Sequence, residues 1–123
     1  MKTLKWVGVL AGALALGIAS PVLAHHSHAM FDHTKDVTLT GKVTVFEFVN
    51  PHASLYVDVK NDKGEMVNYW FEMSNVPNMI HRGIGKTTLK YGDTVTVKFH
   101  PLKDGRPGGN YVSVTTDQGK FYE

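Results

Sequence analysis

Cysteine is absent from the 123-residue chain, which excludes disulfide bonds, thiolate metal sites and thiol nucleophiles. A metal site would therefore have to use imidazole, thioether, carboxylate, amide or amino groups. Long apolar runs are also scarce. The longest covers residues 6–19, about 14 residues, which is short of the roughly 20 that a membrane-spanning helix needs.

The first 24 residues have the pattern of a secretory signal peptide. Two lysines precede the apolar run, a Ser-Pro pair at residues 20–21 ends it, and residues 22–24 offer small side chains before a cleavage point. A retained membrane anchor is the alternative, and the short run counts against it. We expect cleavage after Ala24, a mature chain that starts at His25 without a membrane span, and a periplasmic or secreted location.

An excess of charge of either sign is missing from the mature chain. The chain has 13 Lys and Arg residues and 11 Asp and Glu residues, and Lys2 and Lys5 belong to the signal. With neutral histidines, the remaining charges balance at 11 of each sign. A neutral chain lacks the basic stripe that holds phosphates, so we do not expect nucleic acid as a partner.

The stretch from residue 37 to residue 59 shows the two-residue period of half-buried β-strands. The apolar phase slips by one residue at Val45 and Phe46, which predicts a β-bulge. Asn50, Pro51 and His52 then predict a turn, because proline has no N–H group for the strand ladder. Alternation resumes at residue 53. The pattern therefore predicts a long bent strand, a corner and a return strand.

The remaining sequence predicts three more strands and one helix. The expected elements are a turn at 61–64, a strand at 66–73, a short helix within 74–83, a strand at 94–100, a mobile glycine-rich loop at 103–110, a strand at 111–115 and its extension at 119–122. This order predicts a mostly β domain, a small five-stranded OB-like barrel with one short helix between strands 3 and 4. A β-sandwich is the alternative. The expected organisation is a signal peptide at 1–24, a His-rich segment at 25–36 and one barrel domain at 37–123.

Four of the seven histidines lie within the nine residues HHSHAMFDH at 25–33. Neutral imidazole is the commonest metal ligand in proteins. Cleavage after Ala24 would give His25 a free α-amino group that can chelate an ion together with its Nδ1. A further imidazole would complete a site of three nitrogens. Such a site favours Cu(II), with zinc and nickel as alternatives.

Histidines elsewhere in the chain are candidates for the remote nitrogen of such a site. The candidate metal ligands together are His25, His26, His28, Met30, His52 and His100. His52 is preferred over His100 because Pro51 fixes its corner, and Met30 adds a soft thioether for Cu(I). The alternatives are a solvated N-terminal tail and a strand-end role for His52 in which its ring bonds its own turn.

Five segments together resemble a family of exported bacterial proteins of unknown function. They are HHSHAMFD, LTGKVTVFEFVNPHASLYVDV, YWFEMSNVP, LKYGDTVTV and HPLKDGRPGG. The resemblance covers nearly all of the mature chain, and its most specific parts are the His-His-Ser start and the Asn-Pro-His corner. Phe48 and Ile84 stand where the family pattern usually has tryptophan. The resemblance implies export and one small β-barrel, and it implies no activity.

The sequence thus predicts a periplasmic metal-binding protein, with two alternatives from other classes. One is a metal-independent OB-type binding module for an envelope ligand or a protein partner, with Tyr56, Tyr69, Trp70 and Glu72 as its ligand face. The other is an enzyme, such as a copper oxidase built on the same histidines. We do not expect catalysis, because no nucleophile–base pair or paired carboxylates are visible in the sequence.

Overall fold

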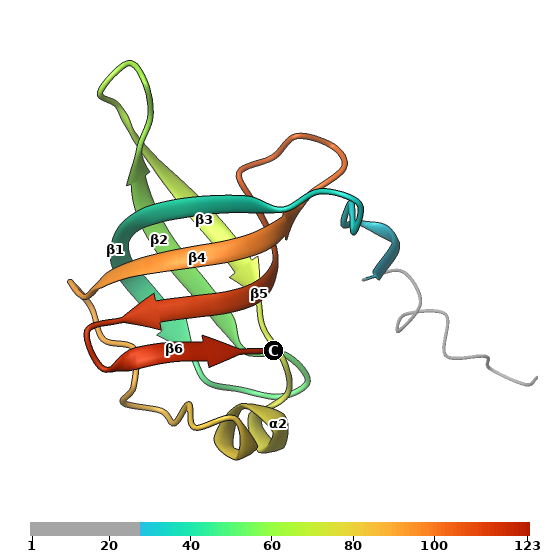
Figure 1. Cartoon of the computed structure of the whole chain (residues 1–123), viewed down its shortest axis with the longest axis vertical. Coiled ribbons are helices and arrows are strands. Elements are labelled where there is room, and N and C mark those ends of the chain that lie inside the picture. The colour runs from blue at the N-terminus through green and yellow to red at the C-terminus, as the bar shows by residue number, and fades with distance from the viewer. Residues whose placement is uncertain (1–27) are drawn as a thin grey trace, which may run out of the picture.

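The computed structural model of the protein describes residues 28–123, so the predicted signal peptide and His25 and His26 lie outside the described residues. The elements follow in the order β1 (Val37–Glu47), β2 (Ser54–Lys60), β3 (Met66–Glu72), α2 (Val76–His81), β4 (Thr94–Pro101), β5 (Gly108–Thr116) and β6 (Gly119–Tyr122). The single sheet that the strands form is shown in Figure 1.

The sheet closes on itself to form a barrel. Its strand order is β3-β2-β1-β4-β5-β6, and a parallel pairing between β3 and β5 joins the two sides of the sheet. Five strands form the closed barrel, and β6 extends the sheet from β5 (Figure 1). The prediction of a mostly β, five-stranded OB-like barrel with one short helix between strands 3 and 4 is confirmed.

A bulge bends β1 beside Thr44. Val43 pairs with Val57, whereas Val45 pairs with Tyr56, so that Thr44 is the extra residue. The bend allows the first half of β1 to pair with β4 and the second half to pair with β2. The apolar pattern placed this bulge one residue too late, because Val45 is an exposed apolar residue that continues the alternation past the bulge.

Two glycines allow the barrel to close. A Cβ atom on Gly108 would lie 2.1 Å from the carbonyl oxygen of Trp70, and one on Gly109 would lie 2.0 Å from that of His100. The prediction of a mobile loop at 103–110 is therefore wrong for residues 108–110, which are buried and begin β5. The glycines serve close backbone approach here rather than mobility.

The helix α2 covers one end of the barrel (Figure 1). The Asn75 side chain caps it by accepting a hydrogen bond from the Asn78 N–H group, and Met79 points into the core. Tyr111 on β5 is fully buried beside this helix. Its hydroxyl donates to the carbonyl oxygen of Tyr122 at 3.2 Å and lies 3.6 Å from the sulfur of Met79.

The buried phenol of Tyr111 predicts a loss of stability in alkali. Burial raises the pKa of Tyr111 to about 12, above the value of about 10 expected in the unfolded chain. The stability that depends on the neutral phenol is therefore complete below about pH 10 and is lost as the pH rises from about 10 towards 12. Tyr111→Phe should lower the free energy of unfolding by about 1 kcal/mol at neutral pH.

The same substitution should make the alkaline loss of stability smaller than in the unsubstituted protein. Urea unfolding at a series of pH values on both sides of about pH 10 measures this difference, since other titrating groups are common to both proteins. Equal losses in the two proteins would show that Tyr111 does not contribute.

Candidate functional site

The N-terminal segment, residues 28–36, crosses the end of β4 and is drawn in blue and cyan in Figure 1. The N–H group of Asp32 donates to the carbonyl of Pro101 at 2.8 Å, and the N–H group of Lys103 donates to the carbonyl of Met30 at 2.9 Å. Phe31 forms an isolated antiparallel bridge with Leu102. The segment is thus joined to the barrel by backbone hydrogen bonds on both sides of Phe31.

Phe31 anchors this segment through its side chain as well. Only 2% of Phe31 is exposed, and its ring centroid lies 6.3 Å from that of Trp70 on β3. The indole N–H group of Trp70 donates to the hydroxyl of Ser54 at 3.1 Å, which fixes the ring against which Phe31 packs. Burial of a whole phenylalanine ring contributes about 1.5–3 kcal/mol, which adds to the backbone hydrogen bonds that hold the segment in place.

Three imidazole rings follow one another from this segment onto the barrel. The ring centroids of His28 and His33 are 5.8 Å apart, and those of His33 and His100 are 4.8 Å apart in an edge-to-face arrangement. A turn at Asp32 holds His33 in this position, because the Asp32 carboxylate accepts hydrogen bonds from the N–H and hydroxyl groups of Thr34. These bonds lower the pKa of Asp32.

The ring of His100 is oriented by acceptors on the N-terminal segment. Its Nδ1 lies 2.9 Å from the carbonyl oxygen of Lys35 and 3.2 Å from the Asp36 carboxylate, which also pairs with Lys98 at 3.1 Å. A carbonyl only accepts hydrogen bonds, so Nδ1 carries the proton and the neutral ring has its lone pair on Nε2. Metal-ligating histidines typically have this arrangement, in which the second ring nitrogen donates to a carbonyl or carboxylate.

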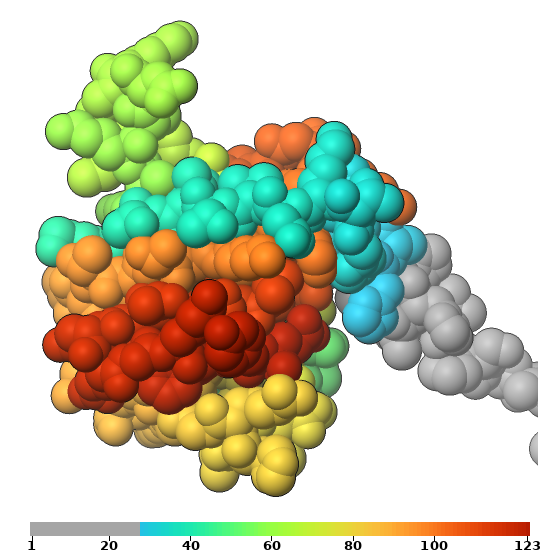
Figure 2. All heavy atoms as spheres, in the orientation of Figure 1, coloured from blue at the N-terminus to red at the C-terminus, as the bar shows by residue number. Residues whose placement is uncertain are grey.

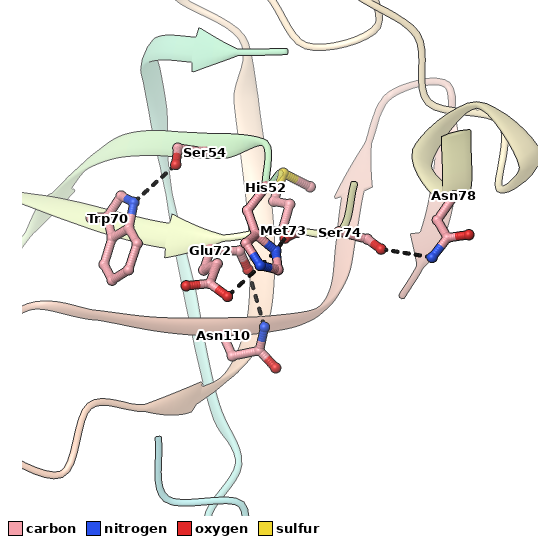
Figure 3. A network of polar contacts seen from close by, with 8 residues as sticks. All are labelled: His52, Ser54, Trp70, Glu72, Met73, Ser74, Asn78 and Asn110. Atoms are coloured by element: carbon pink, nitrogen blue, oxygen red, sulfur yellow. Dashed lines mark hydrogen bonds and ion pairs between the residues drawn. The ribbon is translucent and has the colours of Figure 1, made fainter. Parts of the chain in front are cut away.

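His52 has similar partners at a different place on the barrel. Its Nδ1 lies 3.2 Å from the carbonyl oxygen of Met73 and 3.6 Å from the Glu72 carboxylate, as Figure 3 shows. The hydrogen-bond partner of His52 is therefore Met73, directly after β3 and 21 residues further along the chain, and not its own turn. The side chain of His52 remains 47% exposed.

Asn110 lies between His100 and Glu72 in the sheet. His100 pairs with Asn110 across β4 and β5, and Asn110 pairs with Glu72 across β5 and β3. Two strand spacings of about 4.8 Å place the Cα atoms of His100 and Glu72 roughly 10 Å apart. The row of imidazole contacts from the N-terminal segment thus reaches His100, whereas His52 lies beyond Glu72 on the far side of Asn110.

The described residues do not by themselves form a metal site. Among residues 28–123, no three His, Asp or Glu side chains form a group that could hold one ion. His25 and His26, two of the predicted ligands, lie outside this range, and Met30 is half-buried next to Phe31. His33 was not among the predicted ligands, although its place in HHSHAMFDH was a visible signal.

The four residues of the predicted ligand face do not share one face of the barrel. Tyr56 pairs with Trp70 across β2 and β3, and Glu72 follows two residues after Trp70 on the same side of β3. Tyr69 points the other way and packs against the core, with ring centroids 6.1 Å from Phe71 and 6.2 Å from Phe99. A ligand that stacks on the outer face would not contact Tyr69.

Residues 28–123 contain no helix with the length and apolar character required to cross a bilayer. The fold and the site define a small closed β-barrel with a row of histidines at one edge. The family model described as a family of unknown function, DUF6152, matches residues 13–111, and the chain belongs to this family. This agrees with the resemblance to an uncharacterised family. No curated protein and no solved structure matches the chain.

Replacing the anchor should release the N-terminal segment. Phe31→Ala removes a buried ring and should lower the free energy of unfolding by about 3 kcal/mol. Tyr91→Ala is the control, because Tyr91 is 84% exposed and its loss should change stability by less than about 0.5 kcal/mol. Urea unfolding of both variants makes the comparison. Equal stability of the Phe31 and Tyr91 variants would contradict an anchoring role.

Proposed function

We propose that the protein, after export and removal of residues 1–24, binds a transition metal ion, copper foremost, through its N-terminal histidines. His25 contributes its α-amino group and its ring, and His26 or His28 contributes a second imidazole. His100 contributes the nitrogen from the barrel. A set of neutral nitrogen donors favours Cu(II), with zinc and nickel as the alternatives, and the Met30 thioether suits Cu(I).

The orientation of His100 is the observation that carries this proposal. The carbonyl of Lys35 accepts a hydrogen bond from the Nδ1–H group of His100, which leaves the Nε2 lone pair for an ion. The partner carbonyl belongs to the N-terminal segment itself, so the segment that would bring His25 to the barrel also orients the barrel's ligand. His33 lies next to both His28 and His100. These contacts support a path in which the chain before His28 reaches the barrel beside His100.

The affinity for Cu(II) should depend on the free amino group of His25 and on His100. Protein that has been exported and cut to start at His25 should bind one Cu(II) with a Kd below about 1 µM. Acetylation of the His25 α-amino group should weaken binding at least about tenfold, because the blocked amine can no longer chelate the ion together with Nδ1. His100→Ala should weaken it by at least about tenfold, because loss of a ligand costs no less than loss of one of its hydrogen-bond partners. Competition titration with a chelator of known affinity measures all three.

Two further histidines serve as matched controls in that titration. His81→Ala should leave Cu(II) binding unchanged, because His81 is exposed at the end of α2. His52→Ala should also leave it unchanged, because His52 lies beside Glu72 and Met73, away from the row of imidazole rings that leads to His100. Equal affinity with and without the acetyl group would contradict the amino-group ligand. Loss of binding in the His52 variant together with normal binding in the His100 variant would contradict the role of His100.

A further inference from the structure

A cleft of about 440 Å³ opens at the end of the barrel away from α2. It lies between the first half of β1, the first half of β3 and the chain that connects β4 to β5. Its lining residues are Val37, Leu39, Val67, Tyr69, Phe99, Pro101, Leu102, Gly105, Arg106, Pro107 and Gly108. A second hollow of about 220 Å³ adjoins it and shares Leu39 and Tyr69. The β2–β3 hairpin projects beside this end of the molecule (Figure 2).

The cleft exists because β1 and β2 separate at this end. Their pairing begins only at Lys42 and Asp58, whereas residues 37–41 pair with β4 alone. At Gly41 the two strands are still in close contact, since a Cβ atom there would lie 2.2 Å from the carbonyl oxygen of Asp58, and they diverge over residues 37–40. Inward-facing Leu39 and Tyr69 are consequently only half-buried, while inward-facing residues nearer α2 are fully buried. The cleft thus presents apolar side chains that the barrel itself does not cover.

One positive charge stands at the rim of this apolar cleft. Among the described residues that line it, Arg106 alone is charged. Asp104 holds the Arg106 side chain in place, since its carboxylate accepts from Nε at 2.7 Å and from the Arg106 backbone N–H at 3.1 Å. These bonds lower the pKa of Asp104. A guanidinium group has four further N–H donors on its two terminal nitrogens, and a planar carboxylate matches them.

We propose that this cleft binds a small amphiphilic carboxylate, with an apolar body about the size of a medium-chain acyl group. The apolar body lies against Leu39, Tyr69 and Phe99, and the carboxylate binds the terminal nitrogens of Arg106. The volume falls within the range of about 300–1,000 Å³ that is usual for small-molecule sites, and an apolar lining with one polar anchor is the usual composition. The cleft uses none of the proposed metal ligands.

Titration of the metal-free mature protein with decanoate tests this site. Saturable shifts in the ¹H–¹⁵N NMR spectrum should appear at Leu39, Val67 and Tyr69, and not on α2. Decyltrimethylammonium has the same chain length and the opposite charge, and should bind at least about tenfold more weakly. Val67→Trp should fill the cleft and abolish the shifts. Its own NMR spectrum shows whether the variant is folded.

The charge of Arg106 is tested by a matched pair of variants. Arg106→Gln should weaken decanoate binding about tenfold, whereas Lys103→Gln, an exposed cation outside the lining, should not. Shifts that do not saturate, equal affinity for the two probes, or an unchanged affinity in the Arg106 variant would each overturn the proposal. Because metal is absent from these titrations, such a result would not bear on the Cu(II) measurements above.

Discussion

The short parallel contact between β3 and β5 is the constraint on which the rest of the structure depends. It involves only three residue pairs, and it requires Gly108 because a side chain there would collide with the carbonyl group of Trp70. Gly109 likewise allows β5 to approach the carbonyl group of His100 on β4. The contact closes the barrel and fixes Asn110 between Glu72 and His100. It also places Trp70 where Phe31 can pack against it, so that the N-terminal segment has a binding surface.

The N-terminal segment turns this edge of the barrel into a candidate site. Phe31 and the backbone bonds to Pro101 and Lys103 hold the segment across the end of β4. His28 and His33 then come from one end of the chain and His100 from the other, although 67 residues separate His33 from His100. Anchoring is thus the physical link between the fold and the proposed metal site, while the cleft at the open end has a separate origin in the divergence of β1 from β2.

Local patterns in the sequence predicted the strands, the helix and the barrel, because alternation and turn residues act over a few neighbouring positions. They did not predict the buried start of β5, since glycines that allow close approach look the same as glycines in a mobile loop. They also favoured His52 over His100 and gave His33 no role. Which histidine lies beside the N-terminal segment depends on the pairing of Phe31 with Leu102, a long-range contact that no local pattern records.

Paramagnetic broadening of the histidine ring signals by Cu(II) tests the central claim most directly. The measurement uses mature protein that starts at His25, with Cu(II) added below one equivalent and the ring signals assigned beforehand. Loss of the signals of His28, His33 and His100, with those of His52 and His81 still sharp, is the result that a site between the N-terminal segment and β4 predicts. Sharp signals from His33 and His100 while Cu(II) is bound would contradict it.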